Sequence, residues 1–174
     1  MIIDLFPIVS TKGCAKTYDL DIKDYEFSTI NGSYKATRIS PITLDIQNGD
    51  GKRIKFNLTG SMDFILPCDR CLTDVTITVD LNFEKEFALE KEKIVVEDLD
   101  EPEYIDGLNM DTDQLVYDEM LVNWPMKVLC KEDCRGICSK CGLNLNIKTC
   151  DCDRTVVDPR MAAIKDIFNK SKEV

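Results

Sequence analysis

The sequence predicts an α+β fold that is mainly antiparallel β, with a long hairpin, two helices and a cysteine-rich, zinc-stapled C-terminal segment. Three observations carry this prediction. Apolar and polar residues alternate through the first half, two short helical patterns occur in the second half, and nine cysteines occur without one histidine. We therefore expect an antiparallel β domain over residues 1–89, an acidic linker or loop over 90–110, and a third region over 111–174 that holds a helix, the zinc-binding segment and the C-terminal helix.

Period-two alternation predicts the strands, because successive side chains of a strand point to opposite faces. Asn48 to Gly51 form a turn of small residues that a hairpin needs for positive φ angles. Gly60 interrupts the longest alternating stretch and is expected to mark a bulge or bend. That stretch and the next one are joined by residues 67–72, so they predict a long hairpin with cysteines at its tip. The alternating stretches lie at 18–22, 42–46, 54–66 and 75–83.

Capping residues predict the two helices. Asp111 can cap the first one, with Gln114 at capping-box spacing, and Pro125 stops it. Asp158 followed by Pro159 is a cap with proline at the first helical position, which predicts the C-terminal helix. The apolar stripe of that second helix consists of Met161, Ile164, Ile167 and Phe168.

Composition excludes several classes of protein. No run of about 18 apolar residues occurs, and the first residues lack the pattern of a secretory signal, so we expect a cytoplasmic protein with no membrane partner. Without histidine there is no histidine general base and no histidine metal ligand. No phosphate-binding loop or dinucleotide fingerprint occurs. We therefore expect no enzymatic activity and no small-molecule substrate.

Charge is unevenly distributed along the chain, whose net charge is −10. Residues 84–119 contain 14 acidic and 3 basic residues, whereas residues 127–174 contain 10 basic and 7 acidic ones. The whole molecule is therefore not attracted to nucleic acid, but its C-terminal end can carry a basic face.

The cysteines predict metal binding, because a reducing compartment disfavours a disulfide framework. All-sulfur tetrahedral sites favour zinc or iron–sulfur chemistry. A C-x2-C pair followed by glycine suits a tight knuckle with two thiolates on one ion, and a C-x-C pair lies eight residues further on. We expect these four residues, here called the C-terminal set, to bind zinc: Cys138, Cys141, Cys150 and Cys152.

A second C-x2-C pair lies at the tip of the predicted hairpin and needs two more ligands. The unused pair further along the chain can complete it, which would give a second zinc site, here called the split set: Cys68, Cys71, Cys130 and Cys134. Two alternatives remain open, namely a redox C-x2-C pair and swapped pairings among the eight thiols. Cys14 has no partner at metal spacing and is expected to be a free thiol. We therefore expect one or two zinc ions.

The metal is expected to supply the folding energy of the cysteine-rich segment. Residues 130–153 contain few apolar side chains to bury, whereas structural zinc contributes roughly 10–16 kcal/mol in small peptides. Several basic residues flank the cysteines and are candidates for contact with RNA or a protein partner: Arg135, Lys140, Lys148, Arg154 and Arg160.

Together these motifs resemble the YceD family of large ribosomal RNA subunit accumulation proteins. The resemblance covers nearly the whole chain and rests on four stretches: Cys68-Asp69-Arg70-Cys71-Leu72, residues 129–146, Cys150-Asp151-Cys152 and Asp158-Pro159-Arg160. It implies a non-catalytic role in accumulation of 23S-type ribosomal RNA, hence in ribosome biogenesis. The expected partner is ribosomal RNA or a basic ribosomal protein of the large subunit.

Two other functions fit the cysteine pattern. A redox-regulated zinc chaperone would use the C-x-C and C-x2-C thiolates, which can form disulfides once peroxide releases the metal. A zinc-ribbon regulator would bind nucleic acid, although the overall charge and the lack of a basic recognition helix disfavour it.

Overall fold

The computed structural model describes residues 1–30, 32–91, 93–95 and 102–152. The chain divides into two compact units. The first, here called the sheet unit, comprises residues 1–67 and 74–128. The second, here called the cysteine unit, comprises residues 68–73 and 129–174. The cysteine unit is therefore built from two pieces of chain, the shorter of which is inserted between two strands of the sheet unit.

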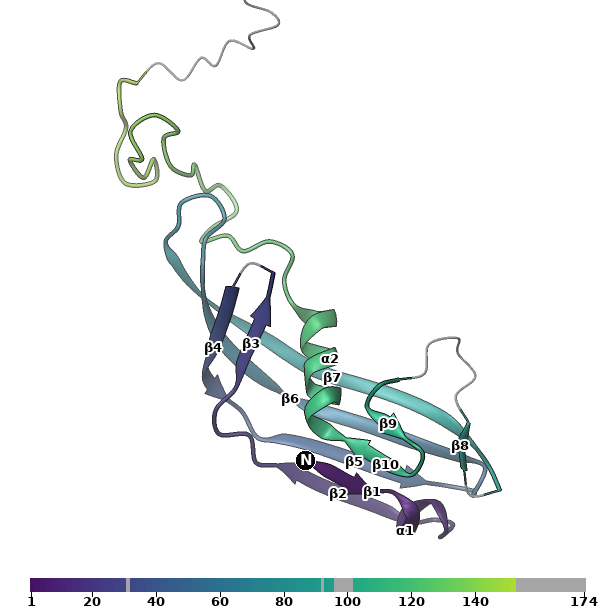
Figure 1. Ribbon diagram of the computed structural model, residues 1–174. Coiled ribbons are helices and arrows are strands. Elements are labelled where there is room, and N and C mark those ends of the chain that lie inside the picture. Colours follow the sequence, from purple (N-terminus) through teal and green to yellow (C-terminus); the bar gives the residue numbers. More distant parts are fainter. Residues whose placement is uncertain (31, 92, 96–101, 153–174) are drawn as a thin grey trace, which may run out of the picture. The chain divides into compact units, whose positions relative to one another are not determined.

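Ten strands and two helices make up the described secondary structure of the sheet unit (Figure 1). They follow one another in this order: β1 Ile2–Asp4, α1 Phe6–Val9, β2 Ala15–Leu20, β3 Glu26–Thr29, β4 Gly32–Ile39, β5 Ile42–Asn48, β6 Arg53–Pro67, β7 Asp74–Glu90, β8 Lys93–Val95, β9 Ile105–Asp106, β10 Asn109–Asp111 and α2 Thr112–Asn123.

The seven-stranded sheet is antiparallel throughout and is organised around β6. One edge of β6 pairs with β5 and then with β4, and its other edge pairs with β7 along the whole strand. The sheet continues through β2 beyond β5, through β3 beyond β4 and through β8 beyond β7. The register between β6 and β7 runs unbroken from Arg53 opposite Ala88 to Pro67 opposite Asp74.

Gly60 lies where β6 changes partners, between the stretch paired with β5 and the stretch paired with β4. It faces Leu81 in the continuous ladder with β7, so the expected bulge is absent from that pairing. A Cβ at this position would lie 2.7 Å from Ile42 Cγ1 and 3.2 Å from Ile42 Cα. The glycine is therefore required by the close approach of β5.

One face of the sheet is apolar and forms the core with α2. Every second residue of β6 from Ile54 to Leu66 is buried except Gly60, as the alternation predicts, and Phe56 and Phe64 are among the buried ones. Figure 1 shows α2 beside β7, and helix and strand are in contact. Trp124, directly after α2, packs its ring 4.6 Å from that of Phe27 and 5.2 Å from that of Phe64.

The helix expected from Asp111 is confirmed. α2 begins at Thr112, and the Asp111 carboxylate accepts a hydrogen bond from the backbone N–H of Asp113 at 3.0 Å. Gln114 does not complete a capping box, because its amide donates to Asp118 instead. The helix expected after Pro159 lies outside the described residues.

The acidic segment differs from the expected linker over 90–110. Its described residues contain β8, β9 and part of β10, and β10 pairs with both β9 and β1 to form a small three-stranded sheet. Tyr104 and Met110 are buried in the core, so the stretch around them is part of the sheet unit. α2 belongs to the sheet unit as well, whereas the sequence grouped it with the cysteines.

One buried polar side chain organises the N-terminal part of the sheet unit. The Asn48 amide donates to the carbonyls of Ile8, Val9 and Thr11 at 2.9–3.2 Å, and its oxygen accepts from the N–H of Gly51. The short helix α1, which the sequence did not predict, ends beside these carbonyls. Asn48 therefore satisfies backbone groups that would otherwise be buried without partners.

No helix among the described residues is long and apolar enough to cross a membrane.

Candidate metal centre

The structure gathers eight cysteines into the two sets that their spacing predicts. In each set, the four sulfur atoms lie within 4.8 Å of one another. All nine cysteines are free thiols, and Cys14, which belongs to neither set, is half-buried. Both sets lie entirely within the cysteine unit.

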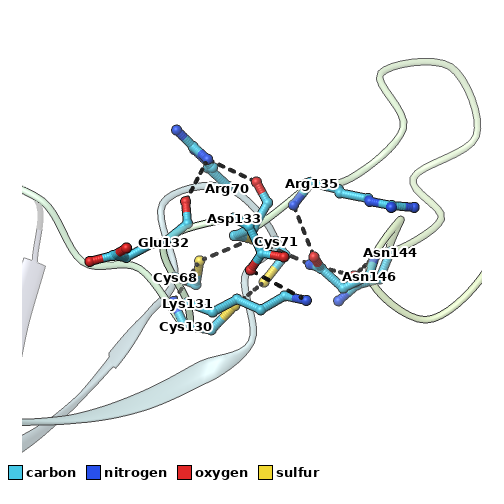
Figure 2. Close-up of polar contacts among 11 residues, drawn as sticks. Cys68, Arg70, Cys71, Cys130, Lys131, Glu132, Asp133, Arg135, Asn144 and Asn146 are labelled. Carbon is cyan, nitrogen blue, oxygen red and sulfur yellow. Dashed lines mark hydrogen bonds and ion pairs between the residues drawn. The ribbon is translucent and has the colours of Figure 1, made fainter.

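The split set joins the two pieces of the cysteine unit (Figure 2). Cys68 Sγ lies 3.8 Å from Cys134 Sγ, and Cys71 Sγ lies 3.5 Å from Cys130 Sγ. These distances exceed a disulfide bond of about 2.05 Å. Four sulfurs at about 2.3 Å from a central zinc ion form a tetrahedron with edges of about 3.8 Å. The donor set and its spacing therefore fit a tetrahedral thiolate metal ion.

The same knuckle occurs at the start of both sets. The N–H of Leu72 donates to the carbonyl of Cys68 at 2.9 Å, and the N–H of Gly142 donates to the carbonyl of Cys138 at 2.8 Å. The residue after the second cysteine has a positive φ in both knuckles, 60° at Leu72 and 71° at Gly142. The second knuckle uses a glycine there, as expected, whereas the first holds a leucine in the same conformation.

Contacts at Arg70 and Gly136 connect the two pieces of the cysteine unit. The Arg70 guanidinium donates to the carbonyl of Cys134 at 2.9 Å, and the Arg70 carbonyl accepts from the N–H of Ile137 at 3.0 Å. A Cβ on Gly136 would lie 2.9 Å from that same carbonyl oxygen. Glycine is therefore required at this point, where the φ angle is also positive at 76°.

The C-terminal set is more open than the split set. Cys138 is buried, Cys150 and Cys152 are half-buried, and Cys141 is exposed. In the split set, by contrast, only Cys130 is exposed. A metal ion in the C-terminal set would therefore be more accessible to solvent and chelators.

Backbone N–H groups favour the thiolate at the first cysteine of each knuckle. Burial raises the pKa of the Cys68 thiol, but surrounding N–H groups, chiefly that of Arg70, outweigh burial and lower this pKa to about 6. The N–H of Cys141 has the largest effect on Cys138, whose pKa is lowered to about 6. One sulfur of each set is thus prepared to bind a cation near neutral pH.

Neighbouring thiols have the opposite effect on another member of each set. The thiol of Cys71 raises the pKa of Cys130 to about 12, and that of Cys141 raises the pKa of Cys152 to about 12. Four sulfurs this close cannot all be negatively charged without a cation among them. Each set is therefore complete as four thiolates only when a cation is bound.

Of the five basic residues expected to contact a partner, three are described. Arg135 and Lys148 line one shallow depression of about 480 Å³ together with Asn146. Lys140 is exposed between the two cysteines of its knuckle. Within the described residues, none of the three forms an ion pair. Arg154 and Arg160 lie outside the described residues.

The sequence reasoning missed the polar residues that surround the sulfurs. Asn146 donates to Cys134 Sγ at 3.3 Å, and Thr73 Oγ1 lies 3.3 Å from Cys71 Sγ. Metal ligands are usually oriented by hydrogen bonds from neighbouring polar side chains. Polar residues close to the cysteines in sequence were therefore the signal that could have identified Asn146 and Thr73.

The molecule combines an antiparallel β unit with a second unit that contains two sets of four cysteines and no histidine. This combination defines a class of protein with candidate metal sites made of sulfur alone. The model of the family described as large ribosomal RNA subunit accumulation protein YceD matches residues 56–168, which include all eight cysteines of both sets. The chain belongs to this family, as its motifs indicated.

Two relatives align with most of the chain. The uncharacterized protein YlbN of Bacillus subtilis is 26% identical over 161 residues, which cover 90% of each chain. The uncharacterized protein ML1660 of Mycobacterium leprae is 27% identical over 132 residues, which cover 74% of this chain and 60% of the relative. No solved structure matches the chain.

Proposed function

We propose that the chain is a non-enzymatic zinc-binding factor that supports accumulation of large-subunit ribosomal RNA and thereby ribosome assembly. The observation that carries the proposal is the family match across both cysteine sets, whose sulfur geometry fits bound metal. Zinc is the ion chosen here, because four thiolates in a tetrahedral arrangement with no histidine suit a closed structural zinc site.

The charge of the two units supports the cysteine unit as the region that binds RNA. The sheet unit has 24 acidic and 12 basic residues, a net charge of −12, whereas the cysteine unit has 8 acidic and 10 basic residues, a net charge of +2. Two zinc ions bound by eight thiolates would lower the net charge of the cysteine unit by about four. The cysteine unit would still repel phosphate far less than the sheet unit does.

The proposed contact surface is the depression beside the split set. Arg135 and Lys148 can both approach a phosphate there, and Asn146 and Thr149 add polar groups to the lining. Figure 2 shows the Arg135 side chain extending away from the sulfurs. Its guanidinium is therefore available for a phosphate, with which arginine forms paired hydrogen bonds.

Depletion of the protein from its own cells tests the role in RNA accumulation. We expect the ratio of large-subunit to small-subunit ribosomal RNA to fall, and the wild-type chain to restore it. The Cys68→Ser/Cys71→Ser chain should not restore the ratio, whereas the control Cys14→Ser should. An unchanged ratio after depletion would exclude the role in RNA accumulation. Full restoration by the split-set variant would exclude a role for metal in the split set.

Crosslinking in cells tests the direct partner. We expect wild-type chain to crosslink to large-subunit ribosomal RNA, and Arg135→Glu/Lys148→Glu to lose most of that signal. Lys16→Glu is the matched control, because it reverses an exposed positive charge on the sheet unit. Crosslinks to a ribosomal protein alone would instead assign the basic protein as the partner.

A further inference from the structure

Residues 142–149, here called the spacer, separate the two cysteine pairs of the C-terminal set but contact the split set. Asn146 is the clearest case. Its Nδ2 donates to Cys134 Sγ at 3.3 Å, and its Oδ1 accepts from the N–H of Arg135 at 2.9 Å. Both partners belong to the chain around the split set, so this side chain connects the two sets.

Asn144 fixes the orientation of Asn146. Its Oδ1 accepts from the backbone N–H of Asn146 at 2.9 Å and from Asn146 Nδ2 at 3.0 Å. Asn146 Nδ2 has two hydrogens, and these two acceptors, Asn144 Oδ1 and Cys134 Sγ, use both of them. The orientation that points the amide N–H at the sulfur is therefore specified by its hydrogen bonds.

The same chain of side chains reaches a second sulfur of the split set. Asn144 Nδ2 donates to Thr73 Oγ1 at 3.3 Å, and that hydroxyl lies 3.3 Å from Cys71 Sγ. Two spacer asparagines thus connect, directly or through one hydroxyl, to one sulfur from each piece of the cysteine unit.

The backbone of the spacer is attached to the chain between the two sets. Leu145 donates its N–H to the carbonyl of Gly136 at 2.9 Å, and Ile137 forms an isolated β-bridge with Asn144. Leu145 is also buried, with 9% of its surface exposed. An ordinary surface turn would need only the contact between Asn144 and Asn146. The hydrogen bonds from the spacer to the split set and to residues 136–137 therefore indicate that the spacer supports the structure around the split set.

We infer that the spacer of the C-terminal set is the outer hydrogen-bonding layer of the split set, that Asn146 positions Cys134, and that the two sets therefore bind metal with positive cooperativity. The inference rests on the proposed metal binding. Metal in the C-terminal set closes the loop formed by the spacer and reduces the entropy that the spacer must lose to order its asparagines. The N–H donated to Cys134 Sγ then stabilises the thiolate that the second ion needs.

Native mass spectrometry of the full chain, stripped of metal and titrated with Zn²⁺, measures this coupling. At one ion per chain, two equal independent sites would leave roughly half of the molecules with one ion, and unequal independent sites would leave more. We expect the one-ion species to be a minor fraction, with metal-free and two-ion chains dominating. A one-ion fraction of half or more would overturn the inference.

Variants assign the coupling to the spacer. Cys150→Ser/Cys152→Ser leaves only the split set complete, and we expect its zinc affinity to fall by roughly 5–150-fold, the usual range of coupling between sites. Asn146→Ala should lower the affinity of the split set about 10–100-fold and increase the one-ion species. Ile147→Ala is the matched control, because that neighbouring side chain is 74% exposed.

The visible spectrum of the Co²⁺-loaded chain provides a readout that a general loss of structure would not reproduce. Asn146→Ala should shift the sulfur-to-metal charge-transfer band while the emission of Trp124, the single tryptophan, stays unchanged. An unchanged spectrum and affinity in Asn146→Ala would overturn this inference alone. A wild-type chain that binds neither Zn²⁺ nor Co²⁺ would overturn the metal proposal together with it.

Discussion

The sheet unit and the cysteine unit bury different kinds of side chain. The sheet unit buries large side chains against one face of a seven-stranded sheet, among them Phe27, Phe56 and Phe64, which are fully buried. The described part of the cysteine unit has no helix or strand of its own beyond one isolated bridge, and four of its five buried side chains are cysteines of the two sets. Those five are Cys68, Cys71, Cys134, Cys138 and Leu145.

This difference fits the proposed metal binding, which would give a defined structure to a short segment without an apolar core. Burial scales with apolar area, about 25 cal/mol per Å², and Leu145 alone offers little of it. Metal coordination by four sulfurs can stabilise a fold by several kcal/mol through only a few atoms. It requires only that the chain bring the four sulfurs together.

Removal of metal should produce the largest difference in hydrogen-exchange protection between the two units. A strong zinc chelator should abolish hydrogen-exchange protection in residues 129–152, because zinc contributes roughly 10–16 kcal/mol to comparable structural sites. Amides of β6 and β7 should keep their protection, since their hydrogen bonds belong to the sheet. Equal protection of residues 129–152 with and without chelator would contradict the contrast.

Phe56→Ala should destabilise the sheet unit and leave metal binding by the cysteine unit unchanged. This ring is fully buried and packs edge-on to Phe87 at 5.5 Å, so its removal should lower the unfolding free energy of the sheet unit by about 3–5 kcal/mol. Denaturant unfolding followed by Trp124 emission measures the loss. Zinc content under native conditions should stay at the wild-type value, and a matching loss of zinc would show that the units are not independently ordered.

Gly136→Ala should weaken the cysteine unit more than Gly142→Ala does. Both glycines have positive φ angles, and alanine in such a conformation costs about 1–2 kcal/mol. Only at Gly136 would the new Cβ also meet a backbone atom, the Arg70 carbonyl, at 2.9 Å, whereas nothing lies within 4 Å at Gly142. Competition with a chelator compares the zinc retained by each variant, and equal retention would show that the contact with Arg70 is unimportant.

Leu72→Gly should strengthen the first knuckle slightly. Leu72 has a φ of 60° and an exposed side chain, so glycine removes a strain of about 1 kcal/mol at little cost in contacts. The greater freedom of glycine in the unfolded chain offsets part of this gain. Slower zinc loss to a chelator would bear out the prediction, and faster loss would show that the leucine side chain contributes to the site.

Sequence reasoning succeeds here where a pattern is local. Alternation locates β5, β6 and β7, because burial of one sheet face imposes period two. Asp111 locates the start of α2 for a similar local reason. Cysteine spacing favoured the two sets that the structure brings together, because two thiolates of a C-x2-C knuckle can bind one ion, but it left swapped pairings open.

The remaining features depend on contacts between distant parts of the chain. The pairing of β1 with β10 joins residues more than 100 positions apart, and no local pattern announces it. Asn48 and Asn146 resemble ordinary turn asparagines in sequence, yet one satisfies three carbonyls around α1 and the other donates to a sulfur. The acidic segment has low apolar content, so its three short strands gave no visible signal.

The insertion of residues 68–73 between β6 and β7 has a consequence during synthesis. Cys71 leaves the ribosome 59 positions before Cys130, its neighbour in the split set. At 5–20 residues per second this gap lasts roughly 3–12 s. During that interval the nascent chain carries two thiols, Cys68 and Cys71, without the other two members of their set. Completion of the split set must therefore wait for translation of the later cysteines, and until then these two thiols remain open to oxidation.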